Sequence, residues 1–192
     1  SAELGLCGLA IEEKYGGTDL DFNTGLLFTE ALAPGFSFAT TIGAHVSIGS
    51  LPIVYYGTEE QKKKYLPKIA SAEYKAAYAL TEPGAGSDAN SGKTKATFSK
   101  DEKSYLINGQ KMWITNGPDA HTYIIYAKTD LDAGSQGITA FIVERDYPGF
   151  SRHQKLDKLG MRGSNTCELV FQDCLVPAEN VLGGEGLGVA VL

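Results

Sequence analysis

The sequence lacks a hydrophobic run long enough to cross a membrane. It contains no stretch of about eighteen consecutive apolar residues, the length that a spanning helix needs. Its most apolar region, Phe36–Tyr56, is interrupted by Gly43, Ser47 and Pro52. We therefore predict no membrane span.

Cysteine and histidine are scarce. The three cysteines, Cys7, Cys167 and Cys174, include no Cys-x-x-Cys pair, which is typical of a reducing compartment and argues against a disulfide framework. The three histidines lie far apart, without the His-x-x-x-His spacing of zinc sites. We predict neither a disulfide nor a metal site.

An excess of basic residues is also missing. The chain has 17 Lys and Arg against 23 Asp and Glu, for a net charge of −6. The one basic run, Lys62–Lys64, follows Thr58–Gln61, which has the capping-box pattern of a helix start, so it indicates a solvated helix face. This charge pattern argues against nucleic acid as a partner.

The pattern of apolar residues changes near residue 74. The earlier part shows helical spacing at Phe22, Leu26 and Leu32, whereas the later part has short β-rich runs. We predict an α+β fold in which a helical part, residues 1–73, precedes a β-barrel or sandwich, residues 74–182. Seven strands are predicted: Tyr74–Thr81, Thr94–Ser99, Tyr105–Ile107, Lys111–Thr115, Tyr123–Lys128, Ile138–Glu144 and Cys167–Gln172.

Two further signals concern local structure. Asn108–Gly109 is the strongest hairpin signal in the chain and predicts a turn between two strands. Residues 183–192 are glycine-rich and end on the apolar run Val189–Leu192, and the chain begins with Ser1. We expect a fragment whose last residues begin a further helical domain.

The segment Tyr78–Asp88 is typical of a ligand-binding loop that leaves a strand. Pro83 presets φ, while Gly84 and Gly86 permit positive φ and leave backbone N–H groups free to form an anion-binding nest. Thr81 and Ser87 add hydroxyl groups. Asp88 is expected to order the loop through its own side chain. The alternative is a plain surface loop.

A companion segment, Lys111–Gly117, contains the only tryptophan of the chain. Strand alternation predicts that Trp113 and Thr115 point to the same face. An aromatic plane beside a hydroxyl suits a flat redox ring. A structural tryptophan in a β core is the alternative.

These two segments resemble those of the acyl-CoA dehydrogenases, flavoenzymes that introduce a 2,3-double bond into acyl-CoA thioesters. A third stretch, Lys155–Leu169, which runs on to Val176–Pro177, is similar as well. Together with Asn180–Gly183, it most resembles the members of the family that act on isovaleryl-CoA and other short branched-chain substrates.

The resemblance implies FAD as cofactor and assigns the residues around it. Thr81 would contact the pyrimidine side of the ring, Thr115 would hydrogen-bond toward N5, and Trp113 would cover another part of the ring. Ser87 would lie near the pyrophosphate and the acyl-CoA. The complete implied set is Tyr78, Ala79, Leu80, Thr81, Gly86, Ser87, Trp113, Ile114 and Thr115.

The resemblance also implies a reaction and partners. A carboxylate removes the α-proton while hydride leaves the β-carbon for flavin N5, and electrons pass to an electron-transfer flavoprotein. In the family, the base and the C-terminal helical bundle follow the region matched here, so no residue up to Leu192 is expected to be catalytic. The fragment alone is expected to bind flavin weakly and to expose apolar surface.

The resemblance further implies a homotetramer for the complete protein and a location in bacterial cytoplasm or mitochondrial matrix. Two other functions remain open. One is an acyl-CoA oxidase on the same fold, and the other is a non-catalytic module that binds acyl-CoA or protein.

Overall fold

The computed structural model describes residues 2–192, in which a helical part leads into one mixed β-sheet. The helices are α1 (Phe22–Leu32), α2 (Ser37–Val46), α3 (Leu51–Tyr56), α4 (Glu59–Ala70) and α5 (Gly188–Val191). The strands are β1 (Ala76–Ala79), β2 (Lys95–Ser99), β3 (Ser104–Thr115), β4 (Thr122–Lys128), β5 (Ile138–Glu144), β6 (Phe150–Arg152), β7 (Thr166–Pro177) and β8 (Val181–Leu182). Short 3₁₀ turns occupy Ala2–Leu4, Glu13–Tyr15, Ala33–Gly35, Ala89–Ser91, Gly134–Gly137 and Ala178–Asn180.

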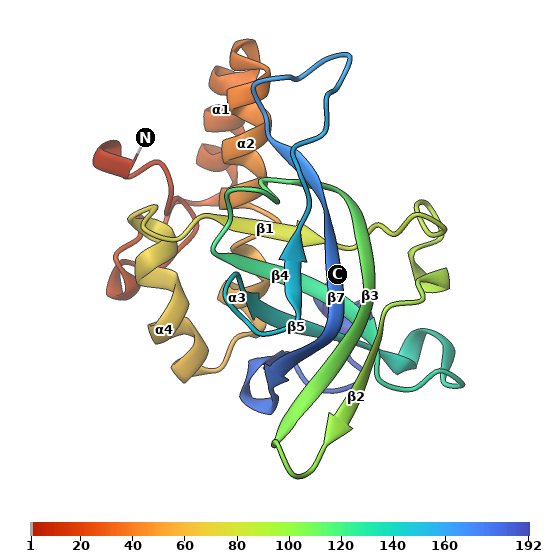
Figure 1. The fold of residues 1–192 in the computed structure, drawn as a ribbon. Coiled ribbons are helices and arrows are strands. Elements are labelled where there is room, and N and C mark those ends of the chain that lie inside the picture. Colours follow the sequence, from red (N-terminus) through yellow and green to blue (C-terminus); the bar gives the residue numbers. More distant parts are fainter. Residues whose placement is uncertain (1) are drawn as a thin grey trace.

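The sheet is strongly curved but open (Figure 1). Its strand order is β6-β7-β3-β2-β4-β5-β8, and β1 pairs in parallel with β4 outside this path. Within the described residues, β6 and β8 form two separate edges that do not pair with each other. The predicted α+β class is therefore confirmed, with an open sheet in place of a closed barrel.

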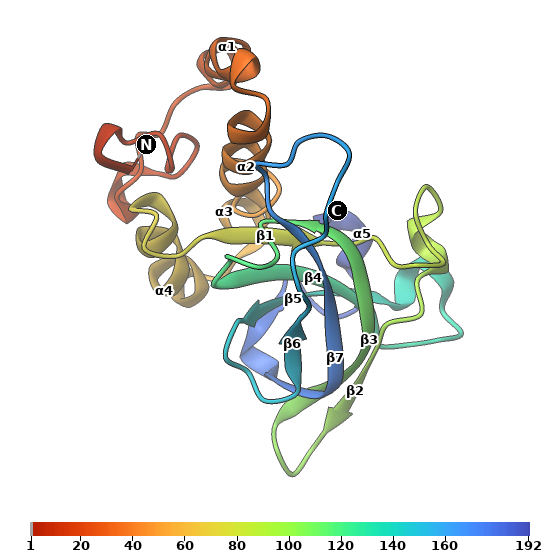
Figure 2. The same ribbon diagram turned by 45° about the horizontal axis from the view of Figure 1, so that its top comes forward.

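Alternation along the central strand gives the sheet two buried faces. In β4, Tyr123 and Ile125 lie in the core enclosed by the curved sheet. Ile124 and Tyr126 lie in a second core, which they share with Tyr65 and other residues of the helical part. The helices thus pack on one face of the sheet, and Figure 2 shows α2, α3 and α4 on that side.

The start of α4 follows the predicted capping box. The Thr58 hydroxyl accepts from the Gln61 backbone N–H, and the Gln61 side chain accepts in return from the Thr58 N–H. The Gln61 amide also donates to the backbone oxygens of Glu179 and Val181, both at 2.8 Å. One local signal therefore starts the helix and ties it to the end of the sheet.

The helical part exposes apolar side chains, and it contacts the loop between β6 and β7. The helix α1 has no buried residue, and it exposes Phe22, Leu26 and Leu27. The loop between β6 and β7 reaches the start of α2, where Gly163 N–H donates to Ser37 Oγ at 3.2 Å (Figure 2). The apolar exposure expected from the sequence is therefore present on α1.

The segment Ser37–Tyr56 is long and apolar enough to cross a membrane by length and composition. In the structure it forms two helices, α2 and α3, of 10 and 6 residues, with a turn between them. A single spanning helix needs about 20 residues. Ile42 and His45 of α2 and Ile53 of α3 are buried in the fold.

The hairpin predicted at Asn108–Gly109 is wrong. These residues lie inside β3, where a register shift against β7 forms a β-bulge and Gly109 has a φ of 148°. The Asn108 side chain exchanges two 2.9 Å hydrogen bonds with Asp173 of β7. Pairing with a distant strand has overridden the local turn preference, and the chain reverses instead at residues 100–103.

A buried histidine joins three elements of the helix-sheet junction. The Ala76 N–H of β1 donates to His45 Nδ1 at 3.1 Å, and His45 Nε2 lies 3.1 Å from the backbone oxygen of Ile69 in α4. Because Nδ1 accepts, Nε2 must carry the proton. Burial lowers the pKa of His45, and the hydrogen bond to Ile69 offsets this only in part.

We expect the protein to lose stability as the pH falls below the ordinary histidine pKa. The folded state holds His45 neutral, whereas the unfolded chain takes up a proton there, so this stabilisation is present above pH 6.5 and is lost below it. Urea unfolding midpoints at pH 7.5 and 5.5 measure the effect. A His45→Gln variant should show a smaller difference between the two values, and an undiminished difference would contradict the assignment.

Candidate functional site

The two segments predicted to bind a ligand meet at one surface hollow of about 190 Å³. Strand β1 and the residues after it contribute Tyr78, Leu80 and Thr81, and β3 contributes residues 113–115. The opposite wall, Ala44 and Ile48, comes from α2 and the turn after it. Tertiary structure has thus joined three segments that are distant in the sequence.

Six of the nine residues predicted for the site line this hollow: Tyr78, Leu80, Thr81, Trp113, Ile114 and Thr115. The other three do not. Ala79 points to the opposite side of β1, into the core within the curved sheet. Gly86 and Ser87 are exposed and lie farther along the loop.

The Trp113 side chain is presented by an irregular strand. Residue 113 has a φ of +60°, and the β3–β7 register shifts between Lys111 and Ile114. The regular alternation used in the prediction therefore fails here, although Trp113 and Thr115 both line the hollow. Trp113 is 60% exposed, which rules out the core role considered as its alternative. A bulky residue at positive φ is an outlier of the kind found at functional sites.

The loop after β1 differs from the predicted nest. Glu82 and Ala85 exchange backbone hydrogen bonds of 2.9 and 3.1 Å, which close a tight turn. Neither Gly84 nor Gly86 has a φ in the left-handed region. In residues 2–192, the N–H groups of Gly84, Gly86 and Ser87 donate no hydrogen bond. The free N–H donors of the predicted nest are therefore present, but the two glycines do not have the positive φ that the sequence predicted for them.

The role predicted for the Asp88 side chain is wrong. Its carboxylate makes no capping hydrogen bond to the turn that follows it. The contact that does form is from the Ser91 hydroxyl to the Asp88 backbone oxygen, at 2.7 Å. The 3₁₀ turn Ala89–Ser91 satisfies its own backbone and leaves the carboxylate exposed.

The hollow is uncharged and carries free polar atoms. None of its lining residues is acidic or basic. Within the described chain, the hydroxyls of Thr81 and Thr115 have no hydrogen-bond partner. Burial raises the pKa of Tyr78, so its phenol stays protonated. The site can therefore hold a flat, largely apolar ring with polar edges, but it offers no carboxylate that could abstract a proton.

Sequence reasoning missed the α2 wall and a buried ion pair behind the loop. Ala44 and Ile48 belong to a segment whose only sequence signal is its hydropathy. Lys111 and Glu82 were read as parts of the two ligand-binding segments, yet their side chains are buried and face each other, with 2.9 Å between Nζ and Oε1. Charged residues separated by 29 positions give no local signal of such contact.

Two family descriptions match the chain. "Acyl-CoA dehydrogenase, N-terminal domain" matches residues 1–73, and "Acyl-CoA dehydrogenase, middle domain" matches residues 77–174. The chain belongs to the acyl-CoA dehydrogenase family. The resemblance stated from the sequence is therefore confirmed.

Individual members of the acyl-CoA dehydrogenase family agree with this assignment. The mitochondrial isovaleryl-CoA dehydrogenase of Solanum tuberosum is 52% identical over 97% of this chain. The mitochondrial 2-methylacyl-CoA dehydrogenase of the same plant is 50% identical over 99%. The crystal structure of an acyl-CoA dehydrogenase complexed with FAD from Bacillus anthracis superimposes with a TM-score of 0.93, at 49% identity over 99% of this chain.

This acyl-CoA dehydrogenase chain is shorter than the relatives. It spans 45% and 46% of the two plant enzymes and 32% of the Bacillus anthracis chain.

Proposed function

We propose that this chain forms the flavin-facing part of an FAD-dependent acyl-CoA dehydrogenase. The exposed indole of Trp113, held at a β-bulge beside two free threonine hydroxyls, is the observation that carries the proposal. The Bacillus anthracis relative is a complex with FAD, which supports the same cofactor here. We further propose the domain limits 1–73, 74–182 and 183–192.

The residues of the hollow fit an isoalloxazine ring. Tyr78, Leu80 and Ile114 would form its apolar surroundings, with Ala79 behind them in the core, and Trp113 would exclude water from one side. Thr81 would hydrogen-bond to the pyrimidine edge and Thr115 toward N5. The free N–H groups of Gly86 and Ser87 would donate to the pyrophosphate, and Ser87 would also contact the acyl-CoA. When bound, FAD would accept the hydride that leaves the β-carbon of the acyl chain.

The proton-abstracting carboxylate is proposed to lie outside this chain. Glu82 is buried and paired with Lys111, and two backbone N–H groups occupy its carboxylate. Glu168 of β7 lies 3.3 Å from His153 Nδ1. Neither carboxylate lines the hollow. The residues described here therefore bind and orient, and a further part of the protein supplies the base.

The proposed substrate is a short, branched acyl-CoA. The names of the two plant relatives, isovaleryl-CoA and 2-methylacyl-CoA dehydrogenase, support this class. We propose an electron-transfer flavoprotein as the electron acceptor, a homotetramer as the complete protein, and a mitochondrial matrix or bacterial cytoplasmic location according to the source. Hydrogen peroxide formation during turnover would identify an acyl-CoA oxidase instead.

Retention of FAD tests the proposed split of the site. We expect residues 1–192 to lose FAD on desalting and the complete protein to retain it, because a ligand that keeps only part of its contacts still loses its rigid-body freedom on binding. Flavin absorbance and fluorescence after desalting measure the outcome. Retention by the short chain would show that the hollow suffices, and loss from both proteins would favour the non-catalytic module.

The hydroxyl of Thr115 should contribute directly to flavin binding. Thr115→Val in the complete protein is expected to weaken FAD affinity about fivefold, because one net hydrogen bond is worth about 1 kcal/mol. Flavin fluorescence titration gives the dissociation constant. Thr97→Val, at an exposed position of β2, is the matched control and should change nothing. Equal affinities for the Thr115 variant and the wild type would contradict the role.

A further inference from the structure

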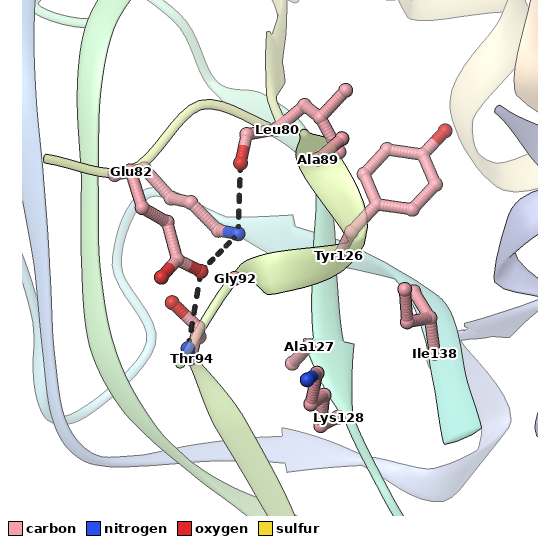
Figure 3. A pocket seen from close by; sticks show the side chains of 10 residues that line it. Leu80, Glu82, Ala89, Gly92, Thr94, Tyr126, Ala127, Lys128 and Ile138 are labelled. Atoms are coloured by element: carbon pink, nitrogen blue, oxygen red, sulfur yellow. Dashed lines mark hydrogen bonds and ion pairs between the residues drawn. The ribbon is translucent and has the colours of Figure 1, made fainter. Parts of the chain in front are cut away.

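A buried ion pair lies directly behind the loop that leaves β1. The Lys111 side chain of β3 is 2% exposed, and its Nζ donates to Glu82 Oε1 at 2.9 Å and to the Leu80 backbone oxygen at 3.1 Å. Glu82 accepts two further hydrogen bonds, from the backbone N–H of Lys93 (2.5 Å) and of Thr94 (3.0 Å). Figure 3 shows the Glu82 carboxylate beside Thr94, with a dashed line for the bond between them.

This pair bridges a gap in the sheet. Strand β1 pairs with β4, and β3 pairs with β2 and β7, so β1 and β3 share no ladder of backbone hydrogen bonds. Close to the gap, Met112 N–H donates to the Thr81 oxygen at 2.8 Å. Lys111 adds two bonds to the same loop, one on each side of Thr81. The loop is therefore held to β3 by one backbone hydrogen bond and by the two bonds of the Lys111 side chain.

The pair does not touch the hollow but connects its two flavin-facing walls. Leu80 and Thr81 on one wall and residues 113–115 on the other line the hollow, whereas Glu82 and Lys111 do not. Burial by itself would raise the pKa of Glu82, but the Lys111 ammonium and the hydrogen bonds outweigh it and lower that pKa. The carboxylate is therefore ionised and needs its cation in place.

We propose that Lys111 and Glu82 are positioning residues that set the distance between the two flavin-facing segments of the site. They act on FAD through Leu80, Thr81 and the bulge at Trp113, without contacting the cofactor. This inference rests on the proposed function of the hollow, and it assigns to the buried pair a role in cofactor affinity in addition to its role in stability.

The test compares two variants of the complete protein that each replace a hydrogen-bonded, lysine-paired carboxylate by an amide, one buried (Glu82) and one partly buried (Glu144). Glu82→Gln removes the charge behind the hollow. Glu144→Gln removes a carboxylate of β5 that is bonded to Lys64 Nζ (2.8 Å), Tyr65 (2.8 Å) and Tyr147 (3.2 Å) and does not line the hollow. Both variants are expected to lower the thermal midpoint. Glu82→Gln alone should weaken FAD affinity by about tenfold, or one decade of dissociation constant, and shift the visible absorption bands of bound FAD.

Three results would overturn the inference. The first is a Glu82→Gln variant that binds FAD as tightly as the wild type. The second is a Glu144→Gln variant that loses as much FAD affinity as Glu82→Gln, because the loss would then reflect lower stability in general. A wild-type complete protein that holds no FAD would overturn the proposed function as well. If the wild-type complete protein binds FAD and the Glu82→Gln variant binds it equally tightly, only the positioning role is overturned and the proposed function stands.

A second variant covers the case in which Glu82→Gln does not fold. The double substitution Lys111→Met with Glu82→Gln leaves no unpaired charge, and the new amide oxygen can still accept from Thr94 N–H. We expect this protein to fold and still to bind FAD about tenfold more weakly than the wild type, because the Leu80 oxygen has lost its donor. Wild-type affinity in the double variant would overturn the proposal.

Discussion

Replacing Lys111 by Met should lower the free energy of unfolding by about 3–5 kcal/mol, the usual cost of leaving one buried partner of an ion pair uncompensated. The Glu82 carboxylate would remain buried with two backbone donors but no cation. Urea unfolding of the FAD-free protein at pH 7 measures the loss. The loss should shrink at lower pH, because without Lys111 burial favours the protonated form of Glu82.

The double substitution Lys111→Met with Glu82→Gln is the control for this prediction. It removes both charges, and neutral replacements of buried ion pairs are often close to neutral in stability. We expect it to recover most of the unfolding free energy that Lys111→Met loses. A double variant as unstable as the single one would show that the cost comes from lost packing and not from an unpaired charge.

Replacing Gly109 by Ala should destabilise the protein by about 2–3 kcal/mol, the upper part of the range of about 1–3 kcal/mol for a strained backbone residue. Gly109 has a φ of +148°, and a Cβ there would lie 2.7 Å from the Thr94 Cα atom and 2.6 Å from its hydroxyl. Neither backbone can move freely, because β3 is paired with β7 on both sides of this point, and the N–H and oxygen of Thr94 are bonded to Glu82 and Lys128. Thermal unfolding of the variant measures the effect.

Gly84→Ala is the matched control, since the same methyl group is added to a loop glycine. A Cβ at Gly84 would meet nothing within 4 Å, and its φ is outside the left-handed region. We expect a change of less than about 1 kcal/mol, and in the stabilising direction, because alanine restricts the unfolded chain. Equal losses at the two positions would contradict the explanation by close contact.

Local signals in the sequence predicted several elements correctly. The capping box at Thr58 does begin α4, and the β-rich runs after residue 74 do form strands. These signals depend on neighbouring residues alone, so no knowledge of the rest of the chain was needed. The Asn108–Gly109 prediction failed because a turn dipeptide was placed inside a strand by its pairing with Asp173 and β7.

The candidate site likewise has features that the sequence predicts and features that only the tertiary structure reveals. The residue types of Tyr78–Ser87 and Trp113–Thr115 are visible in the sequence, and they suffice to state the family resemblance and the cofactor it implies. The sequence does not show where these two segments meet in the folded chain. Ala44 and Ile48 join the site because α2 packs on the sheet, and Trp113 faces the hollow because a bulge interrupts the alternation of β3.

The sequence by itself determined the α+β class, the start of α4 and the two segments that line the hollow, because each depends on residue types a few positions apart. Tertiary structure decided the open sheet, the bulges in β3 and the Lys111–Glu82 bridge. Those features arise from contacts between residues far apart in the chain, whose free energy exceeds the local preference of a turn or a strand.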